Sequence, residues 1–161
     1  MQPPIPTFDI PQLELLESLS FTSLDTSVAV ELGMTAVRLI QKRNLSLAVD
    51  IVLHDDLVFR AKLGATDSTN NEWLAGKAAV TRHFGEPSLL VKLRHLQRGT
   101  PFEQLPQYDH SAMRAFGGSV PLRIGGQVVG TLTASGEPDV IDHDVAETAL
   151  RLFHSVCRAA E

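Results

Sequence analysis

Apolar side chains recur at steps of three and four residues in five stretches of the chain, which is the spacing of one face of a helix. The clearest stretch spans residues 25–44. Asp25 is a typical N-cap residue, and basic side chains gather in the last turn, where the helix dipole is negative. The other predicted helices span residues 12–19, 70–85, 88–99 and 140–160. The apolar stripes expected to face inward are Leu89, Leu93 and Leu96 in residues 88–99, and Ile141, Val145, Thr148 with Ala149, Leu152 and Val156 in residues 140–160.

Two pairs of segments rich in aliphatic and β-branched residues predict two β-hairpins. The first pair is residues 46–54 and 57–63, and the second pair, residues 119–124 and 127–135, flanks the turn dipeptide Gly125-Gly126. In the first hairpin, alternation places Leu47, Val49, Ile51 and Leu53 on one face and Ala48, Asp50, Val52 and His54 on the other. Two hairpins cannot bury their apolar faces alone. The sequence therefore predicts an α/β (α+β) fold in which helices cover a mostly antiparallel sheet.

The length of 161 residues, with 43% hydrophobic and 20% charged side chains, suits one domain with its own core. Pro3, Pro4, Pro6 and Pro11 restrict φ and remove amide donors near the amino end. We therefore expect residues 1–11 to form an extended proline-rich arm and residues 12–161 to form the single domain.

Charge and composition disfavour several classes of protein. Fourteen Lys and Arg residues against nineteen Asp and Glu residues give a net charge of −5, which disfavours binding to DNA. Apolar residues never run for more than three positions, whereas a helix that spans a membrane needs about twenty. The amino end lacks the basic and apolar regions of a secretory signal, so we expect a cytoplasmic protein. The single cysteine, Cys157, excludes an internal disulfide and a zinc site built from thiolates.

The histidines and serines show no spacing typical of a catalytic or metal site. No two of the six histidines are spaced for a shared metal ion, and we expect no metal site. His143 lies between Asp142 and Asp144 at a helix start, where helix capping and solvation explain the cluster more simply than metal or haem ligation does. Ser119 and Ser135 adjoin glycines but lack the surroundings of a hydrolase nucleophile.

Lys77 is the most informative charged residue, because it places an ammonium group within an apolar helical stripe. That stripe consists of Trp73, Lys77, Val80 and Phe84. Two alternatives remain open. Either the aliphatic stem packs on Trp73 while the ammonium reaches solvent, or the ammonium is buried and meets a ligand or an acid such as Asp50 or Glu72.

Lys92, His95 and Arg98 form a basic stripe opposite the leucines of their predicted helix. Most such stripes are solvated, and a minority bind an anion, nucleic acid or an acidic protein surface. The segment Gly117-Gly118-Ser119 fits a turn that enters a strand better than a phosphate-binding loop, because it lacks the lysine of that motif.

Several of these segments form a pattern in their order along the chain. The segments are Asn71-Glu72-Trp73-Leu74, Lys77, His83-Phe84-Gly85, Gly117-Gly118-Ser119-Val120-Pro121, Val129-Gly130-Thr131-Leu132-Thr133-Ala134-Ser135-Gly136 and Asp142-His143. Together they resemble the haem-degrading domain family, which includes GlcG-like and HbpS-like proteins and an uncharacterised UPF branch. The resemblance covers about residues 25–155. It implies a profilin-like fold and a homo-oligomer and points to haem as a candidate cofactor, while relatives range over haem or iron binding, accessory roles beside enzymes and no known activity.

The resemblance also identifies candidate site residues. Phe116 stands where the family often has a histidine, and phenylalanine can neither ligate a metal nor transfer a proton. The residues expected to bind a ligand are Asn71, Trp73, Lys77, Gly117, Gly118, Ser135 and Gly136. A lysine with backbone donors nearby suits a small anionic ligand, such as a carboxylate or a phosphate.

Three functional hypotheses follow. The first is a non-catalytic, oligomeric domain that binds a small ligand or assists another protein, with Asn71, Trp73 and Lys77 at its pocket. The second is an enzyme that modifies haem or another tetrapyrrole. The third is a scaffold for another protein, which binds through the proline-rich arm or the basic stripe.

Overall fold

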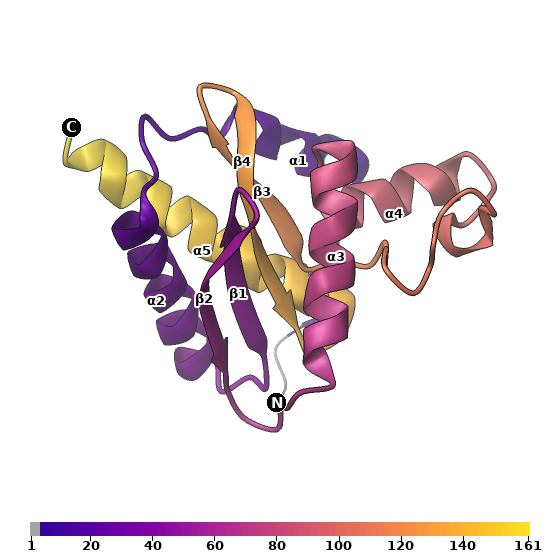
Figure 1. The fold of residues 1–161 in the computed structure, drawn as a ribbon, viewed down its shortest axis with the longest axis horizontal. Coiled ribbons are helices and arrows are strands. Elements are labelled where there is room, and N and C mark those ends of the chain that lie inside the picture. The colour runs from indigo at the N-terminus through magenta and orange to yellow at the C-terminus, as the bar shows by residue number, and fades with distance from the viewer. Residues whose placement is uncertain (1–3) are drawn as a thin grey trace.

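The computed structural model describes residues 4–161 and contains one four-stranded antiparallel sheet with helices on both faces (Figure 1). The strands are β1 (Ala48–Leu53), β2 (Asp56–Lys62), β3 (Ser119–Ile124) and β4 (Gln127–Ser135). The helices are α1 (Ile10–Glu14), α2 (Thr26–Lys42), α3 (Asn70–Phe84), α4 (Ser88–Gln97) and α5 (Asp139–Ala159), with short 3-10 turns η1 (Leu15–Ser18) and η2 (Phe102–Gln104). The predicted fold class is confirmed. Within residues 4–161, none of the helices has both the length and the apolar content needed to cross a lipid bilayer.

Each predicted hairpin supplies two neighbouring strands of the sheet. The strand order is β2-β1-β4-β3, so β1 and β4 join the two hairpins at the centre. Their register sets Asp50 opposite Thr133 and Ile51 opposite Leu132. Because side chains alternate along a strand, this register sorts apolar and polar residues onto opposite faces.

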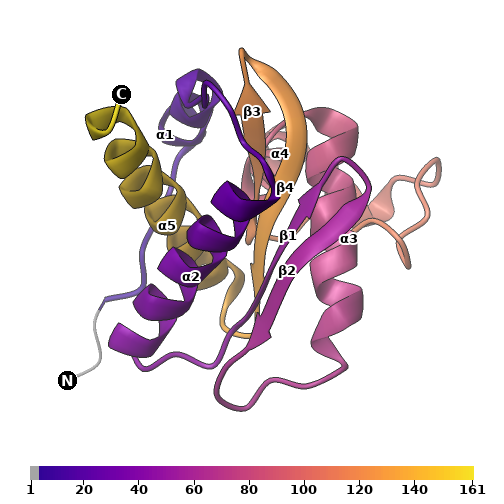
Figure 2. The same cartoon turned by 60° about the vertical axis from the view of Figure 1, so that its left-hand side comes forward.

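The two faces of the sheet have opposite chemical character. Helices α2 and α5 cover one face, and α3 covers the other (Figure 2). The face under α2 and α5 carries buried aliphatic side chains: Val49, Ile51, Leu53, Val120, Leu122 and Leu132. The face under α3 carries buried polar side chains: Asp50, Ser119, Arg123, Thr131, Thr133 and Ser135. Helix α3 therefore packs on a polar layer, where buried groups require hydrogen-bond partners.

The first helix begins inside the stretch expected to form the proline-rich arm, and residues 4–9 before it contain no helix or strand. Residues 1–3 of that arm lie outside the described residues. Helix α1 begins at Ile10 because Asp9 and Gln12 form a capping box, in which each backbone amide donates to the other's side chain at 2.9 Å. Pro11 lies in the first turn, where its missing amide hydrogen is not required. Phe8 and Ile10 pack into an apolar cluster with residues of α4.

Two predicted inward stripes are wrong at their C-terminal ends. Leu152 and Val156 of α5 are 52% and 66% exposed, and Leu96 of α4 is 47% exposed. Helix α5 buries the predicted Val145 and Ala149, together with residues that were not predicted: Asp142, His143, Ala146, Leu150 and Phe153. Because two of these residues are polar and Ala146 is small, hydrophobicity along the sequence does not identify the full buried face.

Candidate functional site

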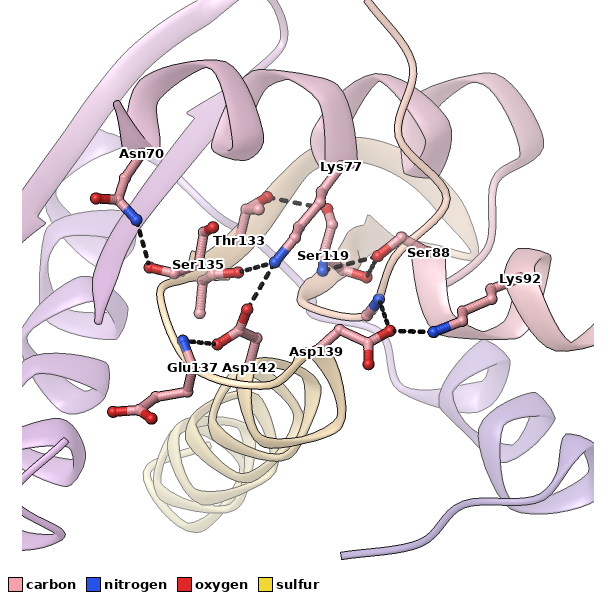
Figure 3. A network of polar contacts seen from close by, with 12 residues as sticks. Asn70, Lys77, Ser88, Lys92, Ser119, Thr133, Ser135, Glu137, Asp139 and Asp142 are labelled. Carbon is pink, nitrogen blue, oxygen red and sulfur yellow. Dashed lines mark hydrogen bonds and ion pairs between the residues drawn. The ribbon is translucent and has the colours of Figure 1, made fainter. Parts of the chain in front are cut away.

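Lys77 lies in the middle of α3 and is only 2% exposed. Its Nζ donates to Asp142 Oδ2 at 2.7 Å and to the carbonyl oxygen of Ala134 at 3.1 Å (Figure 3). Asp142 lies in the first turn of α5 and is 1% exposed. The alternative in which the ammonium reaches solvent is therefore wrong. The acid that pairs with Lys77 is Asp142, and neither Asp50 nor Glu72.

Burial acts in opposite directions on the pKa values of this pair. It lowers the pKa of Lys77 below its usual 10.5, although Asp142 counteracts the shift. It raises the pKa of Asp142 from 3.8 to about 6, although Lys77 counteracts the shift, as does the Glu137 amide, which donates to Asp142 Oδ1 at 2.9 Å. Hydrogen bonds therefore stabilise the Lys77 ammonium and the Asp142 carboxylate in the protein interior, where either charge alone is strongly disfavoured.

A second ion pair lies beside the first. Lys92 of α4 places its Nζ 2.8 Å from Asp139 Oδ2 in the first turn of α5, and the Gly117 amide donates to the same oxygen at 2.9 Å (Figure 3). Burial alone raises the pKa of Asp139, but these two hydrogen bonds and the charges of Lys92 and Lys77 together outweigh it and hold the pKa below its usual 3.8. The Lys92 side chain is 28% exposed, so this pair is in contact with solvent, unlike the pair of Lys77 and Asp142.

Two aromatic rings form a wall beside these ion pairs. The rings of Trp73 and Phe116 meet edge to face, with their centroids 5.6 Å apart. The Arg114 guanidinium lies 4.3 Å from the Trp73 ring, and Lys92 Nζ lies 5.1 Å from the centroid of the Phe116 ring. These cation–π contacts hold the Trp73 and Phe116 rings in their observed orientations. Trp73 is nevertheless 39% exposed, so it offers a rigid apolar surface to another molecule.

The ion pairs and the aromatic wall border one cavity of about 440 Å³, which we call the Lys77 cavity. Its lining residues are Thr69, Asn70, Trp73, Lys77, Lys92, Phe116, Ser135, Gly136, Glu137, Asp139 and Asp142. This volume is sufficient for a small organic molecule. Apolar rings beside a few convergent polar groups are typical of sites that bind such molecules.

A second cavity, of about 420 Å³, lies between residues 20–23 and the C-terminal end of α5. It contains His154 and Cys157, but the Nε2 atom of His154 is already 2.8 Å from the carbonyl oxygen of Ser20. Burial and the nearby Glu161 raise the pKa of the Cys157 thiol, which reduces its reactivity. The Lys77 cavity is the stronger candidate, because buried charged groups line it.

The structure places the seven predicted site residues in two groups. Trp73, Lys77, Ser135 and Gly136 line the Lys77 cavity. Gly117, Gly118 and Asn71 do not line it, although the Gly117 amide donates a hydrogen bond to Asp139, which does.

Asn70 lines the cavity in place of the predicted Asn71. Its Nδ2 donates to the carbonyl oxygen of Ser135 at 3.4 Å. The Oδ1 atom of Asn71 is buried and has no hydrogen-bond partner within residues 4–161. The first turn of α3 therefore presents the preceding asparagine to the cavity.

Sequence reasoning missed both carboxylates of the site. The local sequence pattern indicates only a helix cap at Asp142 and does not distinguish Asp139. The available signal was their spacing of three residues at the start of a helix that follows Ser135-Gly136. That spacing places both carboxylates on one side of the first turn, where they meet lysines from two other helices.

The basic stripe is not a free surface. Lys92 pairs with Asp139, and the His95 ring packs edge-on against Phe102 at a centroid distance of 5.4 Å. Arg98 is the exposed member of the three. A scaffold role for this stripe therefore loses most of the surface on which it depended.

The expectation that His143 is solvated is wrong. His143 is fully buried, and the Phe8 ring packs edge-on against it at a centroid distance of 4.7 Å. Neither ring nitrogen has a hydrogen-bond partner within residues 4–161, and Glu147 Oε2 lies 3.8 Å from Nε2. Burial, with a smaller contribution from Arg151, lowers the pKa of His143 from 6.5 to about 4, although Asp139 counteracts the shift.

Replacing His143 by leucine is expected to reduce the acid sensitivity of folding. Between about pH 6.5 and pH 4 the unfolded wild-type chain binds a proton at His143 that the native protein does not. The free energy of unfolding therefore falls as the pH drops, with a contribution of about 3 kcal/mol from this residue. Asp142 acts in the opposite direction in both proteins, so it cancels in the comparison. Urea unfolding at a series of pH values checks this, and parallel curves for the two proteins would contradict it.

Comparison with known proteins identifies the family of this chain. A family model described as haem degrading protein HbpS-like matches residues 24–151. The chain belongs to the HbpS-like haem-degrading protein family. A UPF0303 protein of Streptomyces coelicolor is 36% identical over 136 residues, which cover 84% of this chain and 86% of the relative. The resemblance stated from the sequence is thereby confirmed, including its UPF branch.

Two crystal structures share the fold of this HbpS-like chain. That of Ybr137w protein has a TM-score of 0.81 at 22% identity and covers 91% of this chain and 88% of that chain. The second, described as a PduOC:haem complex, has a TM-score of 0.69 at 22% identity and covers 80% of this chain and 94% of that chain. At these identities the likeness shows the fold alone.

The Lys77 cavity of this family member does not fit haem. Proteins ordinarily hold haem iron with His, Cys, Met or Tyr, and the cavity lining in the described part of the chain contains none of these. Phe116 occupies the position where the resemblance places a histidine. Lys77 is engaged by Asp142 and is not available to the iron.

Proposed function

We propose that this HbpS-like protein is a binding domain for a small, uncharged organic molecule, which occupies the Lys77 cavity. The observation that carries the proposal is that the buried Lys77 lines a cavity beside the partly exposed ring of Trp73. Lys77 Nζ uses two of its three N–H groups, on Asp142 and Ala134. Within residues 4–161 no third bond of Nζ is present, so the remaining N–H can donate to an oxygen acceptor of the ligand.

The charge of the cavity favours a neutral ligand. Two lysines and three carboxylates line it, and Asp142 and Asp139 already neutralise the lysines. An anion would therefore meet excess negative charge with no unpaired cation to receive it. The anionic ligand favoured by the sequence loses its main support. An uncharged carbonyl or hydroxyl oxygen can accept from Lys77 without that cost, while the rest of the molecule packs on Trp73 and Phe116.

Native mass spectrometry of the protein purified from its own organism tests the proposal. We expect a retained mass that disappears on denaturation. Replacing Trp73 by alanine is expected to weaken retention about tenfold or more, because it removes an apolar contact surface of the site. Leu96→Ala is the matched control, since it removes another exposed apolar side chain outside the cavity. Equal retention in both variants, or no retained mass in the wild type, would contradict the proposal.

We also propose that the chain forms a homo-oligomer, which the family resemblance implies. Leu152 and Val156 support this, because they are exposed one turn apart on α5. Exposed apolar side chains that lie together are typical of protein–protein contacts. The same mass spectrum gives the number of subunits, and a monomer at micromolar concentration would contradict this part.

Haem is the second candidate ligand, because one protein of this fold was crystallised as a haem complex. Haem bound at this cavity would change its absorption spectrum and quench Trp73, the single tryptophan of the chain. The lining residues do not fit haem. We therefore expect the haem absorption spectrum and the Trp73 fluorescence after haem addition to be the same for the wild type and for Phe116→Ala. A spectral change that Phe116→Ala abolishes would favour haem and count against our proposal.

A further inference from the structure

We propose that Lys77 captures an aldehyde or ketone ligand as an imine, with Asp142 transferring the protons. This inference rests on the proposed binding function and names the ligand class of the same cavity. It requires an amine that reaches the ligand, a proton carrier within hydrogen-bond distance, and room for a neutral carbonyl compound.

The geometry supplies the amine and the proton carrier. Lys77 lines the cavity, and its Nζ lies 2.7 Å from Asp142 Oδ2. The other carboxylate oxygen, Oδ1, accepts the Glu137 amide at 2.9 Å. The carboxylate is therefore fixed in orientation, with Oδ2 directed at the amine (Figure 3). A proton can pass between these two atoms without movement of either backbone.

The electrostatics of the pair favour a reactive amine. A protonated lysine is not a nucleophile, so imine formation begins with loss of a proton from Nζ. Burial lowers the pKa of Lys77 and raises that of Asp142 to about 6, which reduces the free-energy cost of moving a proton from one to the other. The less buried pair of Lys92 and Asp139 lacks this property, because hydrogen bonds and the nearby lysine charges hold the pKa of Asp139 below its usual value.

The reaction balances with the groups present. Asp142 takes a proton from the Lys77 ammonium, and the neutral amine attacks the carbonyl carbon, forming the C–N bond as the C=O π electrons move to oxygen. Asp142 returns its proton to that oxygen and takes one from nitrogen, which gives a carbinolamine. Asp142 then protonates the hydroxyl group, the C–O bond breaks, and water leaves as the C=N bond forms. The site carries the same charges before and after, and hydrolysis reverses the sequence.

The cavity also restricts which carbonyl compound is suitable. Three carboxylates in its lining disfavour a keto acid or a sugar phosphate. Trp73 and Phe116 favour an apolar or aromatic substituent beside the carbonyl group. Benzaldehyde has this chemistry, and benzyl alcohol provides the same ring without an electrophilic carbon.

Reductive trapping with benzaldehyde and sodium cyanoborohydride tests the inference on the whole wild-type protein. Reduction converts an imine into a stable benzylated lysine. The chain has four lysines, Lys42, Lys62, Lys77 and Lys92, so peptide mapping assigns every modified side chain. We expect Lys77 to be labelled about tenfold faster than any of the other three, in spite of its burial. Labelling of Lys77 at or below the rate of Lys92 would overturn the inference.

Two further measurements separate this inference from the proposed function. Benzyl alcohol reports non-covalent binding through Trp73 fluorescence. If benzyl alcohol binds and Lys77 is not labelled, imine capture is wrong and the binding function stands. If neither occurs, both lose support. Asp142→Asn is expected to slow labelling of Lys77 about tenfold or more while circular dichroism confirms the fold, and unchanged labelling of a folded variant would exclude Asp142 as the proton carrier.

Discussion

Replacing Lys77 by methionine is expected to lower the free energy of unfolding by about 3–5 kcal/mol. The substitution fills a similar volume but leaves the Asp142 carboxylate buried without its cation. The loss is expected to be smaller at pH 5 than at pH 8, because Asp142, whose pKa is already raised to about 6, then takes up a proton and becomes neutral. Guanidinium unfolding at the two pH values measures both effects.

Two further variants isolate the cause of this loss. Lys92→Met breaks the more exposed pair with Asp139 and is expected to cost about 1 kcal/mol or less. The double variant Lys77→Met with Asp142→Leu is expected to recover most of the stability, because it leaves no unpaired charge. If Lys77→Met costs no more than Lys92→Met, the pair of Lys77 and Asp142 is not buried as described.

Replacing Gly118 by alanine is expected to lower the free energy of unfolding by about 3 kcal/mol. Gly118 has φ of +139°, a conformation that residues with a side chain rarely adopt. A Cβ atom there would also overlap the carbonyl oxygen of Ala134 and lie 2.9 Å from Lys77 Nζ. Strain and steric overlap therefore act together at the ion pair. Thermal unfolding measures the loss.

Gly125→Ala separates the two causes, because its φ is +56° and an added Cβ meets no atom within 4 Å. Only strain acts there, with an expected cost of about 1 kcal/mol. Equal losses in the two variants would show that the close approach of Gly118 to Ala134 and Lys77 has no energetic consequence.

The periodic elements were predictable because local patterns determine them. The spacing from Asp25 onward and the Gly125-Gly126 turn define their elements within a few residues, and antiparallel pairing of two hairpins follows from their apolar faces. The inward face of α5 was predictable only in part, at Val145 and Ala149. It buries Asp142 and His143, whose environment depends on residues more than fifty positions away along the chain.

The candidate site was predictable only where a local sequence pattern marks it. Lys77 stands out because a charge within an apolar stripe requires an explanation, and Trp73 shares its helix face. Its partner Asp142 lies 65 positions away, and nothing local distinguishes a carboxylate that pairs across the fold from one that caps its own helix. The family resemblance points to Asn71 through the segment Asn71-Glu72-Trp73-Leu74, but which asparagine of the first turn faces the cavity depends on where that helix begins.

Occupation of the cavity above Lys77 by a small molecule would be visible in a crystal structure of the protein purified from its own organism. We expect density for a non-protein group between Trp73 and Phe116 that reaches Lys77 Nζ, with Asp142 still paired to the same nitrogen. A cavity closed by side chains of this chain or of a neighbouring subunit, with Lys77 sealed beneath them, would contradict it.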